Sequence, residues 1–105
     1  MSQTIIDMQV FRELQDSAGA DFVSELLDTF FEEAPQLLAQ LQHAFESGDA
    51  DAFRRTAHSL KTNAMTFGAT HMAQTARALE LGGLAAPAAL AAEYQGVAAA
   101  LAQLR

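Results

Sequence analysis

The segment from Asp49 to Gly68, DADAFRRTAHSLKTNAMTFG, contains the pattern that decides the fold. On a helical wheel at about 100° per residue, its apolar positions fall within a stripe about 80° wide. These positions are Phe53, Ala57, Leu60, Ala64 and Phe67. The spacing therefore predicts a helix from about Asp49 to Thr66 that buries this face and stops at Gly68.

The sequence before this segment predicts two more helices. Asp7 is a good N-cap for a short helix that runs to about Ser17 and is broken by Ala18-Gly19. A second apolar pattern then continues to Ser47, with apolar residues three, four or seven positions apart. Its members are Phe22, Leu26, Phe30, Leu37, Leu41 and Phe45. Pro35 interrupts the pattern, and because an interior proline removes a hydrogen bond, we expect a kink or a restart there.

Two further helices are expected after Gly68. One occupies roughly Ala69 to Leu81 and ends at Gly82-Gly83, and Pro87 suits the first turn of the other. The apolar stripe of the last helix is Leu90, Tyr94, Val97, Leu101 and Leu104. Short loops between long helices make sequential helices antiparallel. The prediction is therefore an all-α single domain spanning residues 1–105, an up-down antiparallel four-helix bundle with a short additional N-terminal helix.

Composition agrees with a helical domain and excludes several functions. Half of the 105 residues are hydrophobic, and the β-branched and aromatic enrichment typical of strands is missing. The formal net charge of −7 argues against nucleic acid and anionic membrane surfaces as partners. No apolar run is long enough to span a bilayer, and the first ten residues, MSQTIIDMQV, lack the features of a secretory signal. We therefore expect a cytoplasmic protein, with a monomer as the simplest oligomeric state.

His58 is the candidate reactive residue of the Asp49–Gly68 helix. With Phe53 at zero, His58 lies at about 140° on the wheel, off the apolar face, with Lys61 at about 80° and Arg54 at about 100°. Residues three and four apart are neighbours on a helix, so all three side chains can meet one small anion. A neutral imidazole is a nucleophile, and nearby cations can offset the charge of a phosphoryl group attached to it. Arg55, near 200°, is expected to be a rim contact to a partner.

By pattern alone, an exposed histidine of this kind is most often a surface residue without a role, but a longer motif surrounds it. The segment from Ala57 to Ala69, AHSLKTNAMTFGA, resembles the signature of the histidine phosphotransfer (HPt) family. That signature is approximately A-H-x-L-K-G, then four or five mostly small or apolar residues, a hydrophobic residue, Gly and Ala. The matching residues are Ala57, His58, Leu60, Lys61, Phe67, Gly68 and Ala69. Residues 22–35 and 44–49 and the Leu79-Glu80 pair also resemble the family, so that about three-quarters of the chain is covered.

The resemblance implies a role for the chain and for individual residues. His58 would carry the phosphoryl group, Lys61 would stabilise its charge with possible support from Arg54, and Gly68 would end the helix. The partners would be receiver domains of a hybrid sensor kinase or of response regulators, which bear a phosphorylatable aspartate and supply Mg²⁺. This chain would need no cofactor, and it has no nucleotide-binding motif. It would therefore be a relay between two aspartates and not an enzyme.

One position departs from the family pattern. Thr62 stands where the family usually has glycine, directly after Lys61. Its β-branched side chain could narrow partner choice or slow transfer, or its hydroxyl could donate a hydrogen bond to a phosphoryl oxygen. Met65, beside His58 on the wheel, is expected to be a soft docking contact. For Phe31, at the edge of its own helix's apolar stripe, partner docking and packing against a neighbouring helix are equally open.

The remaining alternatives come from other classes of protein. A metal site formed with His43 and His71 is not expected, because no HxxxH or ExxH spacing occurs within a helix. The second functional hypothesis is a non-phosphorylated adaptor or inhibitor that binds receiver domains, although such a protein has no need of the His58–Lys61 pair. A generic helical scaffold is the third, and the motif argues against it. Met1 and the absence of a linker favour a separate protein over a module of a larger sensor kinase.

Overall fold

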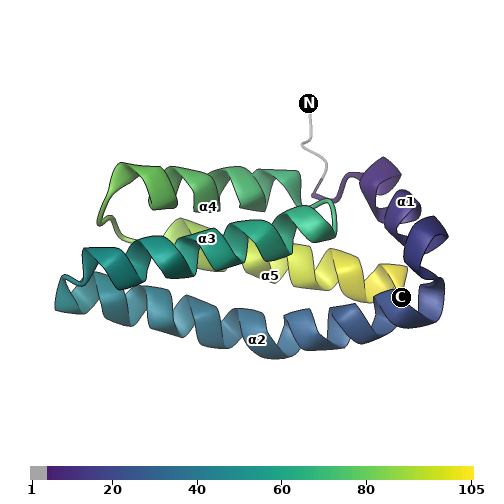
Figure 1. The fold of residues 1–105 in the computed structure, drawn as a ribbon, viewed down its shortest axis with the longest axis horizontal. Coiled ribbons are helices and arrows are strands. Elements are labelled where there is room, and N and C mark those ends of the chain that lie inside the picture. Colours follow the sequence, from purple (N-terminus) through teal and green to yellow (C-terminus); the bar gives the residue numbers. More distant parts are fainter. Residues whose placement is uncertain (1–4) are drawn as a thin grey trace.

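The computed structural model describes residues 5–105, and within them the chain forms five helices and no strand. The helices are α1 (Met8–Ala18), α2 (Ala20–Ser47), α3 (Ala50–Thr66), α4 (Thr70–Gly82) and α5 (Ala88–Leu104). Helices α2 to α5 run alternately up and down as a bundle, and α1 crosses one end of it (Figure 1). The predicted all-α bundle with an additional N-terminal helix is therefore confirmed. Residues 1–4, part of the segment that lacks secretory-signal features, lie outside the described residues.

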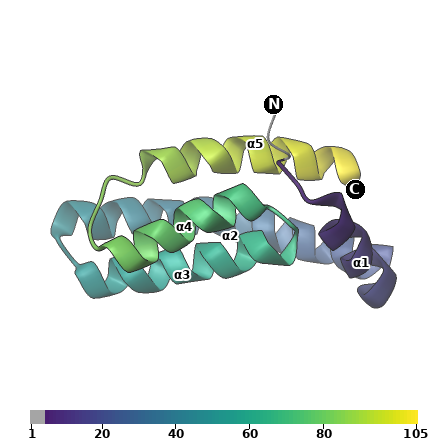
Figure 2. The same ribbon diagram turned by 90° about the horizontal axis from the view of Figure 1, so that it is seen from above.

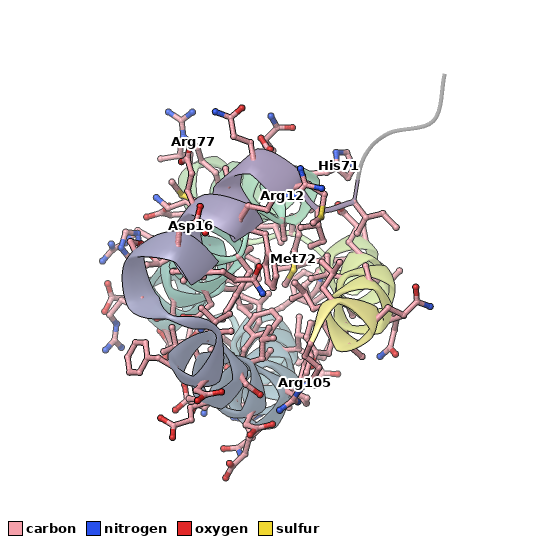
Figure 3. All side chains as sticks on the ribbon, turned by 90° about the vertical axis from the view of Figure 1, so that its right-hand side faces the viewer. Arg12, Asp16, His71, Met72, Arg77 and Arg105 are labelled. Atoms are coloured by element: carbon pink, nitrogen blue, oxygen red, sulfur yellow. The ribbon has the colours of Figure 1, made fainter. Side chains whose placement is uncertain are left out.

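The third helix packs against both α2 and α4 (Figure 2). All five residues of its predicted apolar stripe are buried, and Leu60 is completely inaccessible. Phe30 of α2 packs against Phe67 at the end of α3 and against Tyr94 of α5, with ring centroids 5.2 and 5.6 Å apart. Met72 of α4 points into the same interior (Figure 3). Burial of these apolar side chains supplies most of the stabilising free energy.

The helix ends follow the capping residues read from the sequence. The side chain of Asp7 accepts hydrogen bonds from the first turn of α1, and Asp49 accepts one from Ala52 at the start of α3. Gly48 and Gly68 have φ angles of +72° and +79°, left-handed conformations that end α2 and α3. Pro87 lies one residue earlier than expected, at the N-cap of α5 rather than in its first turn.

Of the kink or restart expected at Pro35, the restart does not occur, and α2 continues as one helix of 28 residues. Pro35 cannot donate a hydrogen bond to the carbonyl of Phe31, four residues earlier. However, Pro35 lies on the exposed side of α2, although the preceding residue, Ala34, is buried. The proline ring therefore does not enter the core, and the helix passes the proline without ending.

The turn between α3 and α4 is also where α1 is attached. The backbone N–H of Asp7 donates a hydrogen bond to the carbonyl of Gly68 at 2.7 Å. A side chain at Gly68 would place its Cβ 2.7 Å from the carbonyl oxygen of Asp7 and 3.1 Å from Cβ of Val10. Gly68 is therefore required twice, once for its left-handed backbone and once for the close approach of α1.

Candidate functional site

His58 lies in the middle of α3 on the side that faces α4, with its imidazole ring 56% exposed. The residue before it, Ala57, belongs to the core, whereas the residue after it, Ser59, is exposed. This placement follows from the helical period, because the residue after a core position points about 100° away from it. The sequence-based expectation of a solvent-facing histidine is thus met by the geometry.

One carboxylate of α4 joins the two central residues of the motif. Glu80 places Oε2 2.7 Å from Nδ1 of His58 and Oε1 2.9 Å from Nζ of Lys61. Only 13% of the Glu80 side chain and 21% of the Lys61 side chain are exposed. The carboxylate therefore bridges His58 and Lys61 from the groove between α3 and α4, with the imidazole on its outer side.

The charge of Glu80 determines which nitrogen of His58 carries the proton. The Lys61 ammonium, aided by His58, lowers the pKa of the Glu80 carboxyl below its usual value, although burial opposes this shift. An ionised carboxylate only accepts hydrogen bonds, so Nδ1 of His58 must donate. Within residues 5–105 no hydrogen bond engages Nε2. In the neutral ring, the lone pair is therefore on Nε2, the nitrogen without a hydrogen-bond partner among these residues, in a side chain that is 56% exposed.

The two arginines expected near His58 are both paired with Asp51. Nη2 of Arg54 lies 2.8 Å from Oδ1 of Asp51, and Nε of Arg55 lies 3.2 Å from Oδ2 of the same carboxylate. Both arginines nevertheless line a hollow of about 400 Å³ together with His58, Ser59 and Glu80. Arg54 and Arg55 are thus beside the site, but both are paired with Asp51, whose single negative charge offsets only part of their positive charge.

The other predicted contact residues are placed on different sides of His58. Met65 is 58% exposed and lines an apolar depression of about 290 Å³ whose rim includes Lys61 and Arg77. Arg77 lies on the outside of the bundle (Figure 3). The hydroxyl of Thr62 donates to the carbonyl of His58 at 3.0 Å. That bond uses the hydroxyl proton, so donation to a phosphoryl oxygen would require the side chain to rotate.

Phe31 is packed within the protein rather than presented beside His58. It is partly buried, its ring centroid lies 6.1 Å from that of Phe30, and the Arg105 guanidinium lies 5.8 Å from the ring centroid. Arg105, whose side chain also binds Ser24 and Asp28, belongs to the end of the chain after α5. These contacts pack Phe31 against Phe30 of its own helix and against Arg105, and Phe31 does not line the hollow that contains His58.

The other two histidines do not join His58. His71, on α4, pairs with Glu93 of α5, with 3.2 Å between Nε2 and Oε2. His43 lines a groove of about 600 Å³ between α2 and α3. Within the described part of the chain no three metal-ligating side chains converge.

Sequence reasoning missed the role of Glu80, although the Leu79-Glu80 pair was noticed. A usable signal existed in the turn at Gly68. In an antiparallel helix pair, residues about equally far from the turn lie opposite each other, and His58 and Glu80 lie 10 residues before and 12 residues after Gly68. An acidic residue at this distance on α4 was therefore a candidate partner for His58.

Comparison with protein-family models matches residues 25–105, which is 81 of the 105 residues, to the Hpt domain. The chain belongs to the Hpt domain family. The resemblance seen in the sequence is thereby confirmed, and Hpt domains in general are phosphocarriers of two-component phosphorelays. No curated protein and no solved structure matches.

The family match begins within α2 at Glu25, so that α1 lies before it, whereas all residues of the His58 site lie inside it. Among the helices of residues 5–105, none combines the length and the apolar character that crossing a membrane requires.

Proposed function

We propose that this Hpt domain accepts a phosphoryl group on Nε2 of His58 from a receiver-domain phosphoaspartate and passes it to a second receiver aspartate. The observation that supports this most directly is the 2.7 Å contact between Nδ1 of His58 and Glu80. This contact fixes the ring and its tautomer, and it leaves the Nε2 lone pair directed toward a partner. A fixed, correctly oriented nucleophile lowers the entropic part of the barrier to transfer.

The transfer of the phosphoryl group consumes no reactant other than the histidine and the phosphoaspartate. The Nε2 lone pair forms the new bond to phosphorus, and the bond between phosphorus and the aspartyl oxygen breaks. The leaving group is the aspartate carboxylate, and no proton needs to move. The phosphorylated ring keeps its proton on Nδ1, and its positive charge lies beside the Glu80 carboxylate. Onward transfer is the reverse of this step, with the second aspartate as the nucleophile.

Lys61 supplies the positive charge for the phosphoryl oxygens. Its ammonium is held by Glu80, 2.9 Å away, one turn after His58 and in the same groove. A cation fixed beside the reacting group stabilises charge in the transition state without reorganisation. We assign Arg54 a supporting role and place Arg55, Thr62 and Met65 in the surface that contacts the receiver.

The remaining features of the proposal concern partners and surroundings. The receiver domains, of a hybrid sensor kinase or of response regulators, bring Mg²⁺ and most of the catalytic groups, so this chain acts as a carrier and not as an enzyme. We place it in the cytoplasm as a monomer that binds neither nucleic acid nor membrane. Its net charge of −7 supports the last point.

The test is transfer of label from radiolabelled, phosphorylated receiver domains of the same organism. Wild-type protein should gain acid-labile, base-stable label, and His58→Gln should gain none. His43→Gln and His71→Gln are matched controls, because both are exposed helical histidines outside the site, and they should be labelled like wild type. Label on His58→Gln would refute the assignment. Binding of a receiver without any labelling of wild type would favour the adaptor.

Two further measurements test the roles of Glu80 and Lys61. Nuclear magnetic resonance of the phosphorylated protein should identify the Nε2 isomer of phosphohistidine, and an Nδ1 isomer would contradict the role given to Glu80. Lys61→Ala should slow transfer while leaving receiver binding largely intact. Unchanged transfer rates would remove Lys61 from the mechanism.

A further inference from the structure

Asp51 occupies an unusual position among the charges around His58. Its single carboxylate engages both arginines of the neighbouring hollow, Arg54 at 2.8 Å and Arg55 at 3.2 Å, from the first turn of α3. The guanidinium groups are therefore held toward the N-terminal end of the helix. His58 lies in the opposite direction along α3, four residues after Arg54.

Arg54 can reach either of two anions. It lines the hollow of about 400 Å³ that contains His58, and also an adjoining hollow of about 420 Å³ that contains Asp51. Asp51 lies three residues before it and His58 four residues after it, and both spacings place side chains in contact on a helix. A phosphoryl group on His58 would thus compete with Asp51 for the same guanidinium.

The existing ion pairs are weak enough for such an exchange. The side chains of Arg54 and Asp51 are 56% and 67% exposed. Exposed pairs contribute little to stability because water screens them. Arg54, and then Arg55, lowers the pKa of the Asp51 carboxyl, so that it is ionised at neutral pH and competes as an anion. A phosphoryl group bears more charge than a carboxylate and attracts a guanidinium more strongly.

We propose that Asp51 is a positioning residue that holds Arg54 and Arg55 away from unphosphorylated His58, and that phosphorylation of His58 transfers Arg54 from Asp51 to the phosphoryl group. The inference rests on the proposed function and adds an element of control to it. Asp51 limits how strongly the protein retains the phosphoryl group, because recruiting Arg54 to that group requires breaking the Arg54–Asp51 pair. It also keeps a free guanidinium from binding other anions beside His58.

The test measures how the phosphoryl group divides between a receiver domain and this protein at equilibrium. Asp51→Asn should raise the ratio of phosphorylated to unphosphorylated protein about two- to five-fold over wild type, the range set by exposed ion pairs. Asp16→Asn is the matched control, since it removes one exposed carboxylate of α1 and should leave the ratio unchanged. Urea unfolding of each variant verifies that the fold is retained.

A double-mutant cycle separates competition from a general effect of charge. In an Arg54→Gln background, competition predicts that Asp51→Asn no longer changes the ratio, whereas a long-range charge effect would persist. The side-chain resonance of Arg54 should also shift on phosphorylation of wild type. An equal effect of Asp51→Asn in both backgrounds, or no effect in either, would overturn the inference while leaving the proposed function intact. Failure of wild type to accept label would overturn both.

Discussion

Replacement of Gly68 by alanine tests how the α3–α4 turn and α1 depend on each other. Gly68 ends α3 in a Schellman arrangement, with its own N–H bonded to Met65 and the N–H of Ala69 bonded to Ala64. Gly48 ends α2 in the same way, with bonds to Phe45 and from Asp49 to Ala44. The two glycines have similar φ angles of +79° and +72°. They differ in their surroundings, since nothing lies within 4 Å of a Cβ built at Gly48.

The expected free energies follow from that difference. A non-glycine residue in the left-handed conformation costs about 1–2 kcal/mol, and both Gly48→Ala and Gly68→Ala incur this cost. At Gly68 the added methyl also meets the carbonyl oxygen of Asp7 at 2.7 Å. Relieving that overlap displaces α1 and weakens the hydrogen bond from Asp7 to Gly68, a further loss of about 1–2 kcal/mol. Gly68→Ala should therefore lower the free energy of unfolding by about 2–4 kcal/mol, against about 1–2 kcal/mol for Gly48→Ala.

Urea unfolding followed by circular dichroism measures both values, provided that the m-value of each variant is unchanged. Hydrogen exchange supplies a second readout, because the amides of α1 should lose protection in Gly68→Ala only. Equal destabilisation by the two substitutions, with α1 protected in both, would refute the argument that Gly68 is needed for the approach of α1.

Three further predictions concern the bundle and the site. The pKa of Glu80 is lowered in the folded state, so its contribution to stability is complete above the unperturbed pKa of 4.5. This contribution is lost as the pH falls through the lower, folded-state pKa. Wild type should therefore lose more stability than Glu80→Gln in acid unfolding. Leu60→Ala should cost about 2–5 kcal/mol in urea unfolding, whereas exposed Met65→Ala should change stability by less than about 0.5 kcal/mol. Thr62→Gly should speed transfer from a receiver in rapid-quench experiments if the threonine obstructs docking, and slower transfer would contradict obstruction.

The helices and their core faces were predictable because they depend on local chemistry. The apolar period of Phe53, Ala57 and Leu60 determines which face of α3 is buried, and Asp7 and Gly48 act through bonds to residues next to them. Such features are local in the sequence and need no knowledge of neighbouring helices. The continuous course of α2 was not predictable from Pro35 alone, because the outcome depended on which side of the helix the proline faced.

The arrangement of charges at the site was predicted only in part. The wheel placed Lys61 and Arg54 near His58, but their actual partners, Glu80 and Asp51, were not identified. Glu80 comes from another helix, and its approach depends on how α3 and α4 pack. Asp51 lies on the same helix at a favourable spacing, so its pairing with Arg54 was accessible to the same reasoning that placed the cations.

A single open nitrogen on His58 has a consequence for how a relay through this protein would proceed. Under the proposed function, donor and acceptor would approach the same edge of the ring, because Glu80 occupies the other side, and the two could not be bound productively together. Each cycle would therefore include departure of one receiver before arrival of the next. Very tight binding to either partner would then slow the passage of signal, so the interface should favour short residence times over high affinity.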